Sequence, residues 1–96
     1  MRKEEFCKKD LDSYRNTIDK IDNKIISLLN KRGKIVQKIG KLKREIHIDL
    51  NQPQREKEII ERMKLKSVIF EKVSIENIWR EIMEASKLIQ NLIVND

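Results

Sequence analysis

One arginine stands in the middle of a long apolar seam in the first half of the chain. The seam residues follow one another at alternating spacings of three and four, the pattern of a helix packed against other helices. They are Leu11, Tyr14, Ile18, Ile21, Ile25, Leu28, Arg32, Ile35, Ile39, Leu42 and Ile46. Because a guanidinium is costly to bury unless an anionic group meets it, Arg32 either fixes the register of a helix pair or binds an anion.

Other polar residues lie on or beside the apolar faces of the predicted helices. They are Lys43, Arg55, Glu56, Ser86 and Gln90. On a helix, Lys43 points within about 20° of Arg32 and lies about 16 Å further along the axis. Taken singly, each residue has an ordinary role as a solvated charge, a helix-terminal carboxylate or a local hydrogen-bonding group. Taken together, they predict a pocket for a small, doubly anionic, hydroxylated ligand.

The spacing of apolar residues predicts an all-α fold with three helices. These cover approximately residues 10–46, 53–64 and 73–93. Asp10 or Asp12 is the expected start of the first helix, and Pro53 fits the first position of the second. Residues 1–9 are expected to form a flexible lead-in, and residues 10–96 a single helical domain.

The first predicted helix is too long for its own chain to cover. Residues 11–46 would form a rod of roughly 54 Å, whereas a compact chain of this size has a radius of gyration of about 12–13 Å. The rod therefore has a frayed end or is buried in a partner molecule. Gly33 and Gly40 interrupt it at a cost of about 1 kcal/mol each relative to Ala. Simple tolerance and the close approach of another backbone or a ligand are both open explanations.

Charge and composition argue against several classes of protein. The net charge of +6 invites a nucleic-acid role, but the 16 acidic residues are interleaved with the 22 basic ones and no dense basic block occurs. No apolar stretch is long enough to cross a membrane, and the first ten residues lack the apolar run of a signal peptide. Cys7 is the only cysteine, so no internal disulfide is possible. We expect a cytoplasmic protein that binds neither nucleic acid nor membrane.

Five separated motifs keep their order and intervals over residues 8–93. They are Arg15, the KR at Lys31–Arg32, the GKLK at Gly40–Lys43, the PQRE at Pro53–Glu56 and the IMEASKLIQ at Ile82–Gln90. In this arrangement the chain resembles the all-helical class of chorismate mutases in its stand-alone, monofunctional form. The resemblance implies a three-helix protomer intertwined in a homodimer with two identical sites. It also implies the Claisen rearrangement of chorismate to prephenate, on the route to phenylalanine and tyrosine.

The resemblance assigns carboxylate-binding roles to residues of all three helices. Arg32 and the partner subunit's Arg15 would hold the substrate carboxylates. Arg55 would support carboxylate binding, and Ser86 would bind near a carboxylate.

The remaining roles concern the reacting ether and the ring hydroxyl. Lys43 and Gln90 would contact the ether oxygen of the breaking bond, and Glu56 would take the ring hydroxyl. The reaction is unimolecular and pericyclic, so the family requires no metal and no cofactor.

One position departs from the family pattern. Where the family usually has Asp, three residues before the Arg of the RE pair, this chain has Gln52. Its amide can still hydrogen-bond the ring hydroxyl, but it brings no charge and is a poorer N-cap for the helix that begins at Pro53.

Three other functions remain open at the level of sequence. An isochorismate pyruvate lyase on the same scaffold needs almost the same anion-binding residues. A non-catalytic helical dimer would fit a site weakened at Gln52. A nucleic-acid-binding helical dimer would need basic residues concentrated on one outer face, and its affinity would fall steeply with salt.

Overall fold

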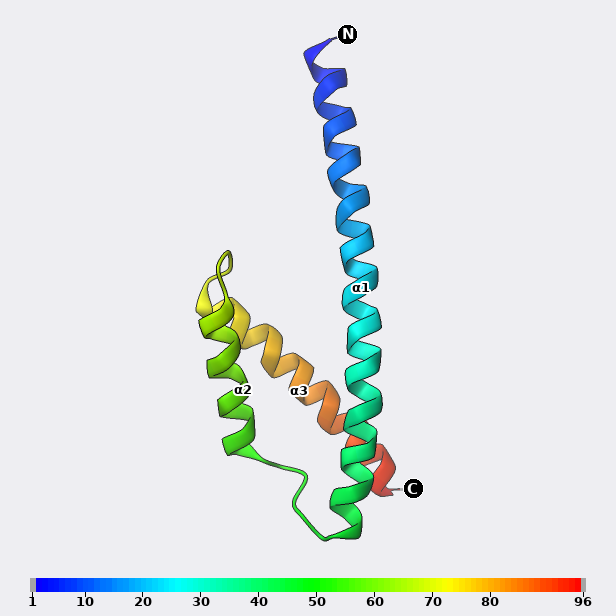
Figure 1. Ribbon diagram of the computed structural model, residues 1–96, viewed down its shortest axis with the longest axis vertical. Coiled ribbons are helices and arrows are strands. Elements are labelled where there is room, and N and C mark those ends of the chain that lie inside the picture. The colour runs from blue at the N-terminus through cyan, green and yellow to red at the C-terminus, as the bar shows by residue number, and fades with distance from the viewer. Residues whose placement is uncertain (1, 96) are drawn as a thin grey trace. The chain divides into compact units, whose positions relative to one another are not determined.

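The computed structural model describes the backbone of residues 2–95 and the side chains of residues 2–92. This part of the chain contains three helices and no strand: α1 (Lys3–Glu45), α2 (Pro53–Lys66) and α3 (Lys72–Asn95) (Figure 1). The predicted all-α class is confirmed. None of these helices combines the length and apolar character needed to cross a membrane.

Helix α1 begins at Lys3, so the predicted start at Asp10 or Asp12 is wrong. Glu4 and Glu5 lie in its first turn, where negative charge is favourable against the helix dipole. The helix ends close to the predicted boundary, at Glu45. His47 follows with a φ of 58°, a left-handed conformation that cannot continue an α-helix.

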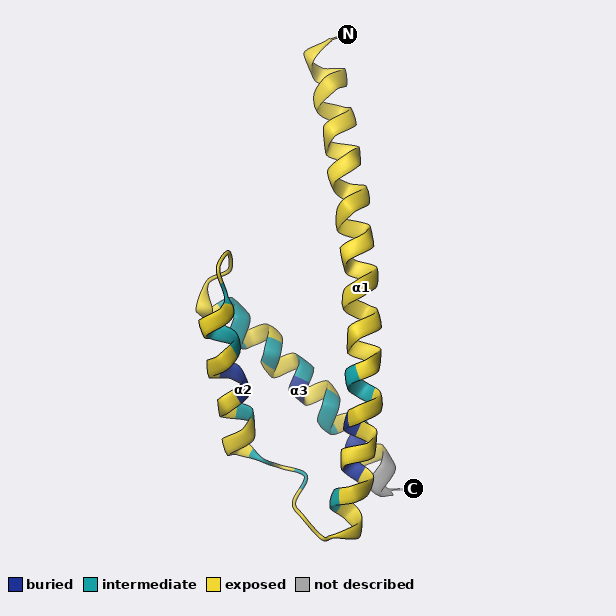
Figure 2. Ribbon diagram, viewed as in Figure 1, coloured by how far each residue is buried: buried dark blue, intermediate teal, exposed yellow. Residues whose placement is uncertain are grey.

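The chain divides into two compact units, Met1–Arg32 and Gly33–Asp96. Within the described part of the first unit, residues 3–32 belong to α1. Its seam residues from Leu11 to Leu28 are all exposed (Figure 2). The apolar stripe predicted from the sequence is therefore not buried in the single chain.

The unit Gly33–Asp96 contains a small apolar core between α2 and α3. Ile59 and Ile60 of α2 and Met83 of α3 are buried, and Met63 and Trp79 pack against them. Ile59, Ile60 and Met63 thus form the inner face of α2. Lys64 of α2 adds an ion pair with Glu76 of α3 at 3.0 Å.

Helix α2 begins at Pro53 as predicted, but its N-cap is weak. Gln52 makes no side-chain hydrogen bond to the first turn of the helix. Its Nε2 donates instead to the Asp49 carbonyl oxygen at 2.8 Å, within the preceding loop. The prediction that Gln52 is a poor N-cap is confirmed. One N–H group at the start of α2 therefore lacks the side-chain acceptor that Asp would provide.

The variant Gln52→Asp is expected to stabilise the protein by roughly 0.5–1 kcal/mol, because the carboxylate can accept from the first turn of α2. The measurement is the free energy of unfolding in urea at one fixed protein concentration. Gln54→Asp is the matched control, since it adds the same charge to the first turn without the N-cap position. A gain no larger than that of Gln54→Asp would contradict the capping argument.

Candidate active site

Six of the predicted site residues belong to the unit Gly33–Asp96. They are Lys43, Gln52, Arg55, Glu56, Ser86 and Gln90. Gln90 is buried and Arg55 is exposed, while the other four are half-buried. Arg15 and Arg32 belong to the unit Met1–Arg32, where Arg15 is exposed and Arg32 is half-buried.

Gln90 of α3 lies directly against the C-terminal part of α1. Its side chain is only 7% exposed, and its Nε2 donates to the Val36 carbonyl oxygen at 3.3 Å. A Cβ atom on Gly40 would lie 3.1 Å from the Gln90 Cγ, tighter than ordinary van der Waals contact. Gly40 is therefore the residue that lets the Gln90 side chain approach α1.

The surroundings of Gly33 are less crowded than those of Gly40. Among the described side chains, the nearest atom to a Cβ there would be the Ile89 Cδ1, at an ordinary contact distance of 3.7 Å. Of the two explanations left open by the sequence, close approach holds for Gly40 and simple tolerance for Gly33.

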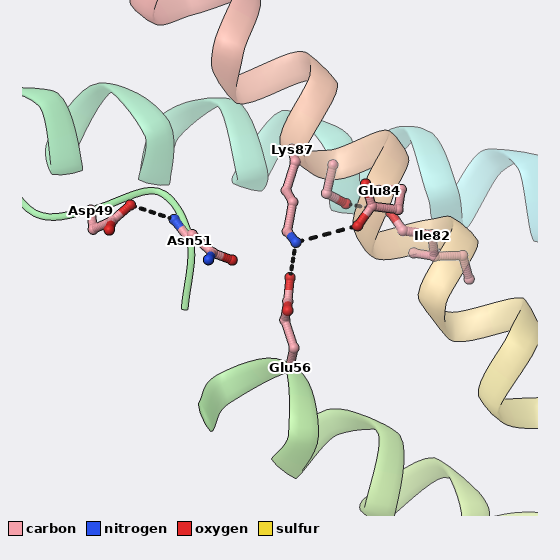
Figure 3. A network of polar contacts seen from close by, with 7 residues as sticks. Asp49, Asn51, Glu56, Ile82, Glu84 and Lys87 are labelled. Carbon is pink, nitrogen blue, oxygen red and sulfur yellow. Dashed lines mark hydrogen bonds and ion pairs between the residues drawn. The ribbon is translucent and has the colours of Figure 1, made fainter. Parts of the chain in front are cut away.

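Glu56 of α2 forms a short ion pair that crosses to α3 (Figure 3). The Lys87 Nζ lies 2.7 Å from the Glu56 Oε1 and 3.3 Å from the Glu84 Oε1. The hydrogen bond to Glu56 is the main reason why the pKa of Lys87 is raised above its ordinary value. Lys87 was not among the residues predicted from the sequence. Its spacing from Glu84 indicates a local pair, but only the packing of α2 on α3 brings it to Glu56.

Ser86 directly precedes Lys87 on α3. Its Oγ donates to the Ile82 carbonyl oxygen at 2.7 Å, one turn earlier in the same helix. The hydroxyl hydrogen is thus directed to the helix backbone, and Ser86 must rotate before it can donate to a ligand.

Two hollows lined by described residues adjoin the predicted residues in this unit. One of about 440 Å³ is lined by Lys43 and Arg44 in the last turn of α1 and by residues 47–50 of the loop that follows it. Another of about 370 Å³ is lined by Glu56 with residues of α2 and α3. Each hollow contains one of the predicted site residues, so neither is a complete pocket for the expected ligand.

Helix α3 connects the candidate residues of the other two helices within this unit. Gln90 packs on α1 beside Gly40, three residues before Lys43. Lys87, one turn earlier on α3, contacts Glu56 of α2. Within this unit, α3 therefore contacts α1 through Gln90 and α2 through Lys87.

Residues 14–91 match the family model described as chorismate mutase type II. The chain belongs to the chorismate mutase type II family. The family predicted from the five sequence motifs is thereby confirmed.

Named relatives and a solved structure agree with this family. Over 81 residues the chain is 33% identical to the bifunctional chorismate mutase/prephenate dehydratase of Aquifex aeolicus, covering 79% of this chain and 22% of that protein. Over 54 residues it is 37% identical to the chorismate mutase of Methanocaldococcus jannaschii, covering 56% of this chain and 54% of that protein. The chain thus spans about a fifth and about half of these two relatives. The chorismate mutase (Form II) structure from Thermus thermophilus has a TM-score of 0.84 and 28% identity, over 85% of this chain and 94% of that chain.

The two glycines are expected to respond differently to a methyl group. Gly33→Ala gains helix propensity without a clash, whereas Gly40→Ala forces the Gln90 side chain to move. Gly33→Ala should therefore be the more stable variant by about 1–2 kcal/mol in urea unfolding. The double variant Gly40→Ala/Gln90→Ala removes the clashing Cγ and should show favourable coupling in a double-mutant cycle. Equal stabilities of the two single variants would contradict the close approach at Gly40.

Proposed function

We propose that this protein is a chorismate mutase that converts chorismate to prephenate as a homodimer, in the biosynthesis of phenylalanine and tyrosine. The observation that carries the proposal is the family match over residues 14–91, because that span includes every residue of the predicted site. The packing of Gln90 against Gly40 of α1 and the ion pair of Lys87 with Glu56 of α2 also support the proposal.

The proposed reaction is a rearrangement within one molecule, so the protein has two tasks. It must hold the enolpyruvyl side chain over the ring in a geometry close to that of the transition state. It must also stabilise the negative charge that grows on the ether oxygen as the C–O bond breaks. Arg32 and the partner subunit's Arg15 are proposed to perform the first task by binding the two carboxylates, with Arg55 and Ser86 in support.

Lys43 and Gln90 are proposed to perform the second task. Lys43 supplies a positive charge toward the ether oxygen. The Gln90 amide has two N–H groups, and one of them donates to the Val36 carbonyl oxygen. The other N–H is the proposed donor to the ether oxygen. Since an amide is uncharged, this position adds no requirement for acid to the reaction.

Glu56 is proposed to accept the hydrogen bond of the ring hydroxyl. A carboxylate at this position lies in the first turn of α2, where its charge is favourable against the helix dipole. Gln52, one turn earlier, would add a neutral amide to the same end of the site. This hydroxyl contact would orient the ring relative to the two arginines.

The exposed seam of α1 supports the homodimer. Arg15 precedes Arg32 by seventeen residues, about 26 Å along the helix, too far for both to bind one small substrate from the same chain. A second copy that covers the seam in the antiparallel direction would bring its own Arg15 toward Arg32. The site would then be completed by the partner subunit.

The proposal is tested by adding chorismate to the purified protein and identifying the product, with isochorismate in a parallel reaction. Saturable formation of prephenate is the expected result. Release of pyruvate from isochorismate alone would instead indicate a lyase.

The variants Arg32→Ala and Lys43→Ala are each expected to lose about 100-fold or more in kcat/KM, because Arg32 is proposed to bind a substrate carboxylate and Lys43 the ether oxygen. Both should keep the sedimentation behaviour of the wild type. Lys41→Ala is the matched control, since Lys41 is an exposed lysine on the same part of α1. Activity of Lys43→Ala equal to that of Lys41→Ala would disprove the assignment of Lys43.

A further inference from the structure

The ion pair between Lys87 and Glu56 joins α2 to α3 and is shorter than the other pair described between these helices. Its N···O distance is 2.7 Å, compared with 3.0 Å for Lys64 and Glu76. The side chains of Lys87 and Glu56 are 29% and 27% exposed, whereas that of Glu84, the second partner of Lys87, is 64% exposed. Glu56 is therefore the principal partner of Lys87.

Lys87 also lies among the residues of the proposed site. It follows Ser86 directly and precedes Gln90 by one turn of α3. Figure 3 shows its side chain extending from α3 to the Glu56 carboxylate at the start of α2. The pair of Lys64 and Glu76, by contrast, involves none of the proposed site residues.

Two physical consequences follow from this placement. A glutamate side chain has several rotatable bonds, and a charge-assisted hydrogen bond fixes the direction of its carboxylate. A carboxylate beside a doubly anionic ligand also repels that ligand, and an adjacent ammonium group offsets the repulsion. The pKa of Lys87 is raised above the ordinary lysine value, mainly by the hydrogen bond to Glu56, so its ammonium is charged across the neutral range.

We propose that Lys87 is a positioning residue of the active site, which holds the Glu56 carboxylate toward the ring hydroxyl and offsets its charge against the dianionic substrate. This inference rests on the proposed function. Lys87 acts through Glu56 and does not itself touch the reacting atoms.

The test compares the steady-state kinetics of Lys87→Met and Lys87→Arg with those of the wild type. Lys87→Met, which removes the cation, should raise the KM for chorismate about tenfold with a smaller change in kcat. Lys87→Arg, which keeps a cationic donor, should stay within about twofold of the wild type. Lys64→Met is the matched control, because it removes the ion pair between Lys64 and Glu76, and its KM should be unchanged.

Two further readouts separate positioning from a purely structural role. The KM defect of Lys87→Met should shrink as the salt concentration rises from about 0.05 M to about 0.5 M, because salt screens the repulsion between Glu56 and the substrate. In a Glu56→Gln background, Lys87→Met should have no further effect on KM. If Lys87→Met does not fold, Lys87→Gln provides the same comparison.

The inference is overturned if Lys87→Met behaves like Lys64→Met, with a lower melting temperature and an unchanged KM. It is also overturned if the KM defect persists in the Glu56→Gln background. In both cases the wild type still forms prephenate, so the proposed function stands. A wild-type protein that does not turn over chorismate would instead refute the proposed function itself, and the role of Lys87 with it.

Discussion

Helix α1 carries more apolar surface than a single chain buries. From Leu11 to Leu42, its seam residues other than Arg32 are between 41% and 68% exposed. Burying a side chain of this kind stabilises by about 1.5–3 kcal/mol, so covering the whole seam is worth on the order of 10 kcal/mol. A domain of this size has a total stability of similar magnitude. The free energy available from burying this seam is the physical reason for proposing that a second copy covers α1.

The need to cover the apolar seam of α1 also links stability to the proposed chemistry. A partner that covers the seam would also surround Arg32, the one charged side chain in it, and the guanidinium then needs an anion or an acidic residue beside it. Within the unit Gly33–Asp96, α3 places Gln90 on α1 and Lys87 on Glu56 of α2. Under the proposed function, this unit would supply Lys43, Glu56 and Gln90, and arginines of two copies would hold the substrate carboxylates.

The sequence predicts the helices well because their signals are local. Pro53 marks the start of α2, and the spacing of Ile59 and Ile60 identifies its buried face. The start of α1 is wrong because Asp10 and Asp12 resemble N-caps, although the Lys- and Glu-rich residues before them are also good helix formers.

The site is only partly predictable from sequence, because its contacts depend on packing between helices. Neither the approach of Gln90 to Gly40 nor the pairing of Lys87 with Glu56 can be derived from spacing along one helix. The weak cap at Gln52 was predictable, since capping depends on the residue type at one position. The roles of Arg15 and Arg32 stay predictions, because they concern a second copy of the chain.

The central claim, that each site is shared between two copies, is tested most directly with a heterodimer. Arg15→Ala and Arg32→Ala chains would be co-expressed with different affinity tags, and the heterodimer purified through both tags. If one copy supplies Arg15 to the Arg32 of the other, one of the two sites keeps both arginines. The heterodimer should then have about half of the wild-type activity, although each mutant homodimer is nearly inactive. A heterodimer as inactive as the homodimers would contradict the shared site.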